Sequence, residues 1–146
     1  SDATALLPLP GPNDDKYTRG VVGVVAGSPP YPGAGVLCSG AARLGGAGMV
    51  RYAGSASDVV INRWPEIVVA ADGPATAGRV EAWVVGPGAG TDEAATARLT
   101  QALASQVLVV IDADGLTLLS QDSSLREMIA TRHASGLAQD VGRDEG

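Results

Sequence analysis

Residues 20–50 read GVVGVVAGSPPYPGAGVLCSGAARLGGAGMV, and this stretch decides the fold. The apolar run over 20–26 is typical of a buried strand. After a loop of Gly, Ser and Pro, small residues from Ala34 to Leu44 predict a helix that ends near Gly45. Strand, glycine-rich loop and helix in this order form the nucleotide and phosphate sites of α/β proteins. Because no Gly-Lys-Ser/Thr follows, the loop is not a Walker A motif.

The composition of the chain is that of one domain with an aliphatic core. It has 146 residues, of which 45% are hydrophobic and only 3% aromatic. Sixteen acidic residues against ten basic ones give a net charge of −6. An acidic chain without a basic patch argues against nucleic acid as a partner.

Cysteine content and hydropathy limit the class of protein further. Cys38 is the only cysteine, which excludes an internal disulfide and a cysteine-based zinc site. No other set of metal ligands stands out. The sequence shows no signal peptide and no apolar run near the roughly 20 residues of a membrane span. We therefore expect a cytoplasmic protein that does not enter a membrane.

Strand and helix patterns alternate along the rest of the chain. We expect strands over 49–53, 67–70 and 82–85 and in QVLVVID from Gln106, and helices that begin near Asp58, Thr91 and Leu116. In this interpretation Asp58 and Thr91 cap their helices. The alternation predicts a parallel sheet with helices on its faces.

The two ends of the chain differ from this pattern. Residues 1–15 are proline-rich and predict an extended arm or linker, so that the domain occupies 16–146. From Thr131 onward the sequence is polar and has no strand pattern.

Three loops rich in glycine or acidic residues follow predicted strands, over 27–34, 86–90 and 112–116. Ligands of open α/β sheets bind at the edge where the strands end, so we expect these loops to form a site. The candidates for phosphate or loop contacts are Gly33, Gly86, Gly88, Asp112 and Asp114. Each glycine could instead simply turn the chain, and Asp114 could cap the next helix.

Several segments, in order and at suitable spacing, resemble the NAD(P)H-hydrate dehydratase domain of the ribokinase-like superfamily. They are KYTRGVVGVVAGS (16–28), PGAGVLCSGAARLGGAGMV (32–50), Pro65-Glu66, VVGPGAGTDE (84–93) and VVIDADGLTLL (109–119). The resemblance implies an incomplete three-layer α/β/α sandwich, the N-terminal half of that domain.

The family resemblance also implies a lyase activity. Such enzymes remove water from hydrated NADH or NADPH with ADP or ATP and Mg²⁺, ADP being the donor in most bacteria. The ring hydroxyl is phosphorylated and phosphate is then eliminated. By the same resemblance Ala34 and Gly90 contact substrate, and His133 does so if 131–136, TRHASG, stands for the family's T-P-H-x-G-E motif.

Two departures from the family leave alternatives open. The family's catalytic aspartate belongs to a later G-T-G-D motif without a match here, so the catalytic residue is unknown and we expect the isolated chain to be inactive. A half-sheet with uncovered strands favours a homo-oligomer. The alternatives are a thiazole or hydroxymethylpyrimidine kinase of the same superfamily, and a non-catalytic remnant that binds nucleotide or a partner subunit.

Overall fold

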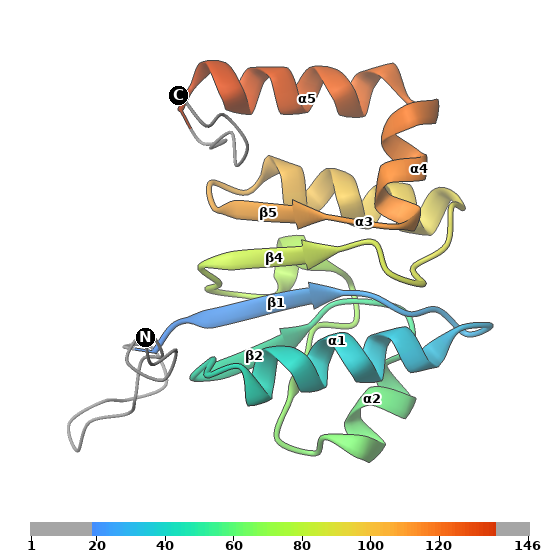
Figure 1. Cartoon of the computed structure of the whole chain (residues 1–146), viewed down its shortest axis with the longest axis vertical. Coiled ribbons are helices and arrows are strands. Elements are labelled where there is room, and N and C mark those ends of the chain that lie inside the picture. Colours follow the sequence, from blue (N-terminus) through green and yellow to red (C-terminus); the bar gives the residue numbers. More distant parts are fainter. Residues whose placement is uncertain (1–18, 137–146) are drawn as a thin grey trace, which may run out of the picture.

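Five parallel strands form one sheet in the computed structural model, which describes residues 19–136 (Figure 1). The strands are β1 (Val21–Val25), β2 (Met49–Tyr52), β3 (Val68–Val69), β4 (Ala82–Val85) and β5 (Leu108–Ile111). Their order in the sheet is β3-β2-β1-β4-β5, and all four neighbouring pairs are parallel. The predicted parallel sheet is therefore confirmed, and all strand ends point to the same edge.

Helices cover both faces of this sheet and give the predicted three-layer α/β/α arrangement (Figure 1). They are α1 (Pro32–Leu44), α2 (Ser57–Arg63), α3 (Glu93–Ala104), α4 (Asp114–Gln121) and α5 (Ser123–Ala134), with a 3₁₀ turn, η2, at Pro74–Thr76. One core cluster joins the sheet to α1 and α2, and a second joins it to α3, α4 and α5.

Alternation along the strands sends successive side chains into these two clusters. Val24 packs on the α1 side and Val25 on the α3 side. The largest buried side chain, Trp83 of β4, lies over Gly23 of β1, where an added Cβ would stand 2.3 Å from the indole ring. The scarcity of aromatic residues thus leaves one Trp, accommodated by one glycine, at the centre of the α3-side core.

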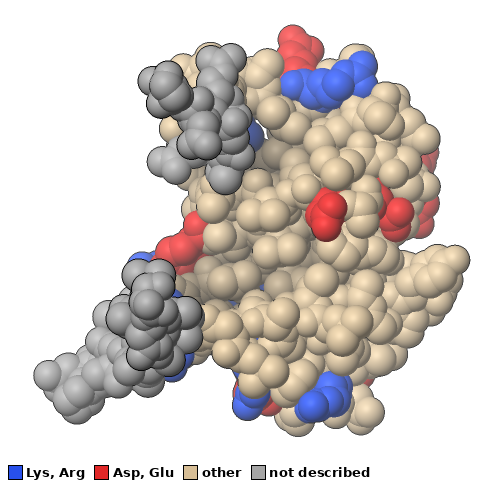
Figure 2. Space-filling model, in the orientation of Figure 1, with Lys and Arg blue, Asp and Glu red and all other residues tan. Residues whose placement is uncertain are grey.

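The α1 side of the sheet is covered over β1 and β2 but open over β5. Leu108 and Val110 point to this side, because Val110 aligns with Val84 and Val84 with Val24, and both are 49% exposed. Figure 2 shows this face of the molecule, on which uncharged atoms predominate and charged residues lie mainly toward the margins. Leu108 and Val110 therefore form an exposed apolar pair on the uncovered part of the sheet.

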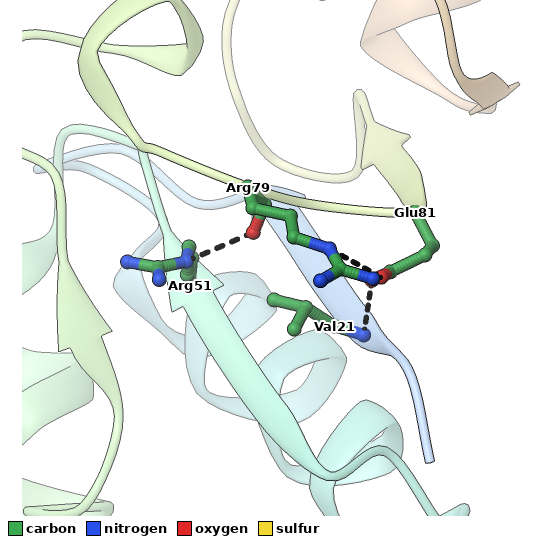
Figure 3. A network of polar contacts seen from close by, with 4 residues as sticks. All are labelled: Val21, Arg51, Arg79 and Glu81. Atoms are coloured by element: carbon green, nitrogen blue, oxygen red, sulfur yellow. Dashed lines mark hydrogen bonds and ion pairs between the residues drawn. The ribbon is translucent and has the colours of Figure 1, made fainter. Parts of the chain in front are cut away.

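Polar side chains fasten the opposite, amino-terminal edge of the sheet (Figure 3). The Val21 backbone N–H donates to Oε2 of Glu81 at 2.5 Å, and Glu81 forms an ion pair with Arg79. Arg51 Nε donates to the Arg79 carbonyl at 3.0 Å. These contacts join the starts of β1 and β4 to β2.

A buried arginine fastens the same edge at β5. The Arg132 guanidinium, on the last turn of α5, donates to the carbonyls of Leu103, Ser105 and Val107, which lie before β5. Burial lowers the pKa of this guanidinium. Arg132 thereby fixes the end of α5, a helix that the polar sequence from Thr131 did not predict.

Two expected helix caps are wrong by one or two residues. Asp92, not Thr91, caps α3, because its Oδ1 accepts the Ala95 N–H at 2.9 Å. Ala56, not Asp58, precedes α2, and Asp58 lies within its first turn. The predicted arm at 1–15 lies outside the described residues. Within 19–136, each helix is too short or too polar to traverse a lipid bilayer.

Candidate functional site

Backbone hydrogen bonds join the first two predicted loops at the carboxyl edge of the sheet. The Gly27 N–H donates to the Pro87 carbonyl at 2.8 Å, and the Ser28 hydroxyl donates to the Gly88 carbonyl at 2.8 Å. The loop after β1 and the loop after β4 are therefore one rigid unit. Ser28 uses its hydroxyl proton in this contact, which gives it a structural task.

The third loop is held against the second by Asp114 and Gly86. Asp114 Oδ2 accepts the Gly90 N–H at 2.9 Å, so this carboxylate binds the neighbouring loop and does not cap α4. Gly86, at φ +132°, packs so closely that an added Cβ would lie 1.9 Å from the Asp112 carbonyl oxygen. Asp112 Oδ1 accepts the N–H of Ala113, the residue before α4.

Two glycines near the start of α1 differ in how much space surrounds their Cα atoms. At Gly35 an added Cβ would lie 2.8 Å from the Ala26 carbonyl, so glycine is needed for packing there. At Gly33 nothing lies within 4 Å of such a Cβ. Ala34 contacts the second loop, because a Cβ on Gly88 would meet its methyl at 2.6 Å. The structure thus brings Ala34, Gly86, Gly88, Gly90, Asp112 and Asp114 together at one edge of the sheet.

A cavity of about 460 Å³ opens beside these loops on the α3 side. It is lined by the loop after β1, the loop after β2 and the segment from Ala89 into α3; the residues are Val25, Gly27, Ser28, Pro29, Pro30, Tyr31, Gly54, Ser55, Ala89, Gly90, Thr91, Asp92, Ala94, Ala95 and Arg98. Gly90 is the predicted site residue among them. The only charged side chains in this lining are Asp92 and Arg98.

Tyr52, at the end of β2, links the two loops that follow β1 and β2. Its side chain is fully buried, its hydroxyl donates to the Ala26 carbonyl at 2.7 Å, and it accepts the Ala56 N–H at 3.0 Å. Burial raises the pKa of the Tyr52 phenol, although the hydrogen bond from Ala56 and the charge of Arg98 oppose the shift. This buried hydroxyl joins the loops after β1 and β2.

Sequence analysis missed Arg98 and the loop after β2, represented by Gly54 and Ser55. The loop carries the same signal as the loops over 27–34 and 86–90, a glycine directly after a predicted strand. Arg98 carries none, because an arginine in a helix pattern is typical of a surface position until the orientation of the helix is known.

His133 lies away from these loops. It follows Arg132, whose guanidinium binds the segment before β5 at the opposite edge of the sheet, and its side chain is exposed. Within residues 19–136, no three His, Cys, Asp or Glu side chains are close enough together to hold a metal ion. The lining offers hydrogen-bond donors and the opposite charges of Asp92 and Arg98, which suits binding of a polar molecule.

Comparisons with known proteins agree with this geometry. A family profile described as NAD(P)H-hydrate dehydratase matches residues 22–135. The bifunctional NAD(P)H-hydrate repair enzyme Nnr of Mycobacterium tuberculosis H37Rv is 52% identical over 151 residues, which cover 100% of this chain. The chain spans 32% of the length of that relative.

Solved structures identify the fold as ribokinase-like. An ADP/ATP-dependent NAD(P)H-hydrate dehydratase from Bacillus subtilis, co-crystallised with ATP and Mg²⁺, superposes with a TM-score of 0.66 at 25% identity, covering 75% of this chain and 43% of that chain. A ribokinase-like superfamily protein from Enterococcus faecalis V583 gives the same TM-score and identity, covering 79% of this chain and 44% of its own.

Proposed function

The chain belongs to the NAD(P)H-hydrate dehydratase family, and we propose that the protein carrying it is a lyase that dehydrates NADH hydrate or NADPH hydrate with ADP or ATP. The observation that supports this most is the union of three loops at the carboxyl edge of the sheet, two of which line one cavity. Nucleotide ligands of parallel α/β sheets bind at this edge.

The proposed reaction transfers a phosphoryl group to the ring hydroxyl and then eliminates phosphate, which restores the double bond. In this scheme the described residues bind and orient, because phosphoryl transfer depends on positioning and electrostatic stabilisation. Magnesium would neutralise charge on the donor phosphates. Asp112 and Asp114 already accept backbone N–H groups, and within residues 19–136 no three His, Cys, Asp or Glu side chains lie close enough together to hold the ion.

Recovery of reduced nicotinamide tests the proposed activity. The whole protein that contains this chain, incubated with NADH hydrate, Mg²⁺ and ADP, should restore the absorbance of NADH, and we expect ADP to serve better than ATP. A heat-inactivated sample is the control. Consumption of ADP or ATP without any recovery of NADH would contradict the dehydratase and favour a kinase.

We propose further that Ala34 and Gly90 contact the substrate, with Gly33, Gly86 and Gly88 forming the surrounding backbone. The support is their placement: Ala34 lies in the first turn of α1 against Gly88, and Gly90 lines the cavity. Ala34→Leu should weaken NADPH binding at least about tenfold, since the added bulk lies at the loop junction. Ala41→Leu adds the same bulk to an exposed position of α1 and is the control.

Self-association through the open face over β5 is our proposal for the assembly. Its support is the exposure of Leu108 and Val110 on a parallel edge strand, an arrangement that favours pairing with another chain. Leu108→Lys should shift the mass measured by light scattering toward the monomer. Leu44→Lys, at a 72% exposed position on the end of α1, should leave the mass unchanged.

We also propose that the protein works in the cytoplasm, where the reduced nicotinamide pool would generate its substrate. Cell fractionation with an antibody against the chain tests this location. Recovery in the membrane or the extracellular fraction would contradict it.

A further inference from the structure

Arg98 is the one cation among the residues that line the cavity. Its helix, α3, follows the loop after β4, and Arg98 is the sixth residue of that helix. Arg98 Nε donates to the Ala53 carbonyl at 3.0 Å. This contact with the end of β2 fixes the guanidinium against the loop after β2.

The rest of the Arg98 guanidinium has donors to spare. Within residues 19–136, the Nε contact is the only hydrogen bond that it makes, and no carboxylate forms an ion pair with it. Asp92, the other charged residue of the lining, has its Oδ1 committed to the cap of α3. The cavity therefore has a half-buried cation whose Nη groups lack an acceptor in the part of the chain that the structure describes.

The chemistry of these donors selects an oxyanion. Guanidinium groups bind phosphate through two parallel N–H···O bonds, and such charge-assisted bonds are about twice as strong as neutral ones. A cavity of about 460 Å³ is large enough for part of a nucleotide. Fixing Nε on a backbone carbonyl aims the two Nη groups and reduces the entropy lost on binding.

We propose that Arg98 is an anion-binding residue that holds a phosphate group of a nucleotide bound in this cavity. This deepens the proposed function, on which the identity of the nucleotide rests. The phosphate belongs either to the dinucleotide substrate or to the ADP or ATP donor. Both have the same phosphate chemistry, and the titrations below separate them.

Calorimetric titration of the whole protein that contains this chain with NADPH, NADH, ADP and adenosine tests this role. Arg98→Gln keeps a donor near the position of Nε but removes both Nη groups and the charge, and it should weaken binding of at least one phosphate ligand by about tenfold to a hundredfold. Arg98→Lys should recover part of the loss. Arg126→Gln, an equal loss of charge on an exposed position of α5, is the control.

The pattern across ligands decides the source of the phosphate. Weakened NADH and NADPH binding assigns the phosphate to the dinucleotide, and weakened ADP binding assigns it to the donor. Unchanged affinity for all phosphate ligands, an equal loss for adenosine, or no binding by the unaltered whole protein would overturn the proposal. Because the titration needs no turnover, a protein that binds through Arg98 but never restores NADH would refute the proposed activity alone.

Discussion

The two edges of the sheet differ in what their charged side chains bind. At the amino-terminal edge, Arg51 and Arg132 bind backbone carbonyls and Glu81 accepts a backbone N–H, so charged side chains serve the protein itself (Figure 3). At the carboxyl edge, backbone N–H groups and glycines join the loops, and the Nη groups of Arg98 have no protein acceptor among the described residues. The carboxyl edge is therefore the one at which hydrogen-bond donors, the Nη groups of Arg98, remain for a ligand.

The largest expected effect tests how tightly the carboxyl edge is built. Gly86→Ala would place a methyl 1.9 Å from the Asp112 carbonyl oxygen at φ +132°, so the loops after β4 and β5 must separate. We expect the free energy of unfolding in urea to fall by about 4 kcal/mol.

Gly90→Ala is the matched control for Gly86→Ala. Its φ is +85°, but nothing lies within 4 Å of the added methyl, so only backbone strain of about 1 to 2 kcal/mol should appear. Equal losses for the two variants would show that the loops are not in close contact.

A smaller effect links stability to pH through Tyr52. Tyr52→Phe leaves the buried Ala26 carbonyl and Ala56 N–H without their partner and should cost about 2 kcal/mol at neutral pH. Because burial raises the pKa of the phenol, the unfolded chain releases this proton first as pH rises. The unaltered protein should therefore lose stability above about pH 10, and Tyr52→Phe should lack that loss.

Urea titrations across this alkaline range measure the difference. Tyr31→Phe, at a 68% exposed ring, is the control and should change stability by less than about 0.5 kcal/mol. A Tyr52→Phe protein with the same alkaline loss as the unaltered chain would show that this hydroxyl is not the group responsible.

The smallest effect concerns the amino-terminal edge. Glu81→Gln keeps an acceptor for the Val21 N–H but removes the ion pair with Arg79. In this pair the Arg79 side chain is 65% exposed and the Glu81 side chain 40%. We expect a loss of about 1 kcal/mol in unfolding free energy and unchanged nucleotide affinity. Weaker nucleotide binding in this variant would contradict the claim that the amino-terminal edge is structural and the carboxyl edge binds the ligand.

Strong local patterns made most of the fold predictable. The strand over 82–85 is found within the predicted bounds, because a short apolar run between turn residues has few alternative structures. The helix predicted from Ala34 begins two residues earlier, at Pro32, since proline fits the first turn of a helix. The order of the loops followed from chain alternation alone.

Contacts between distant segments were not predictable in the same way. Asp114 reads as a cap in the sequence, yet its carboxylate binds Gly90, 24 residues away. Arg98 reaches the cavity only because its side of α3 faces the end of β2. The packing of the whole core sets this orientation of the helix, so the local sequence does not reveal it. His133 matched a motif by spacing, but the helix that carries it directs it to the other edge of the sheet.

Chemical-shift mapping of the labelled protein during titration with NADPH, and then with ADP, tests whether the ligand site lies at the carboxyl edge of the sheet. We expect signals to move for the amides of the loops after β1, β2 and β4 and for the Arg98 Nε–H group. Signals near Glu81 and Val107, at the opposite edge, should stay in place. Movement concentrated at those amino-terminal positions, or no movement at all, would contradict a ligand site at the carboxyl edge.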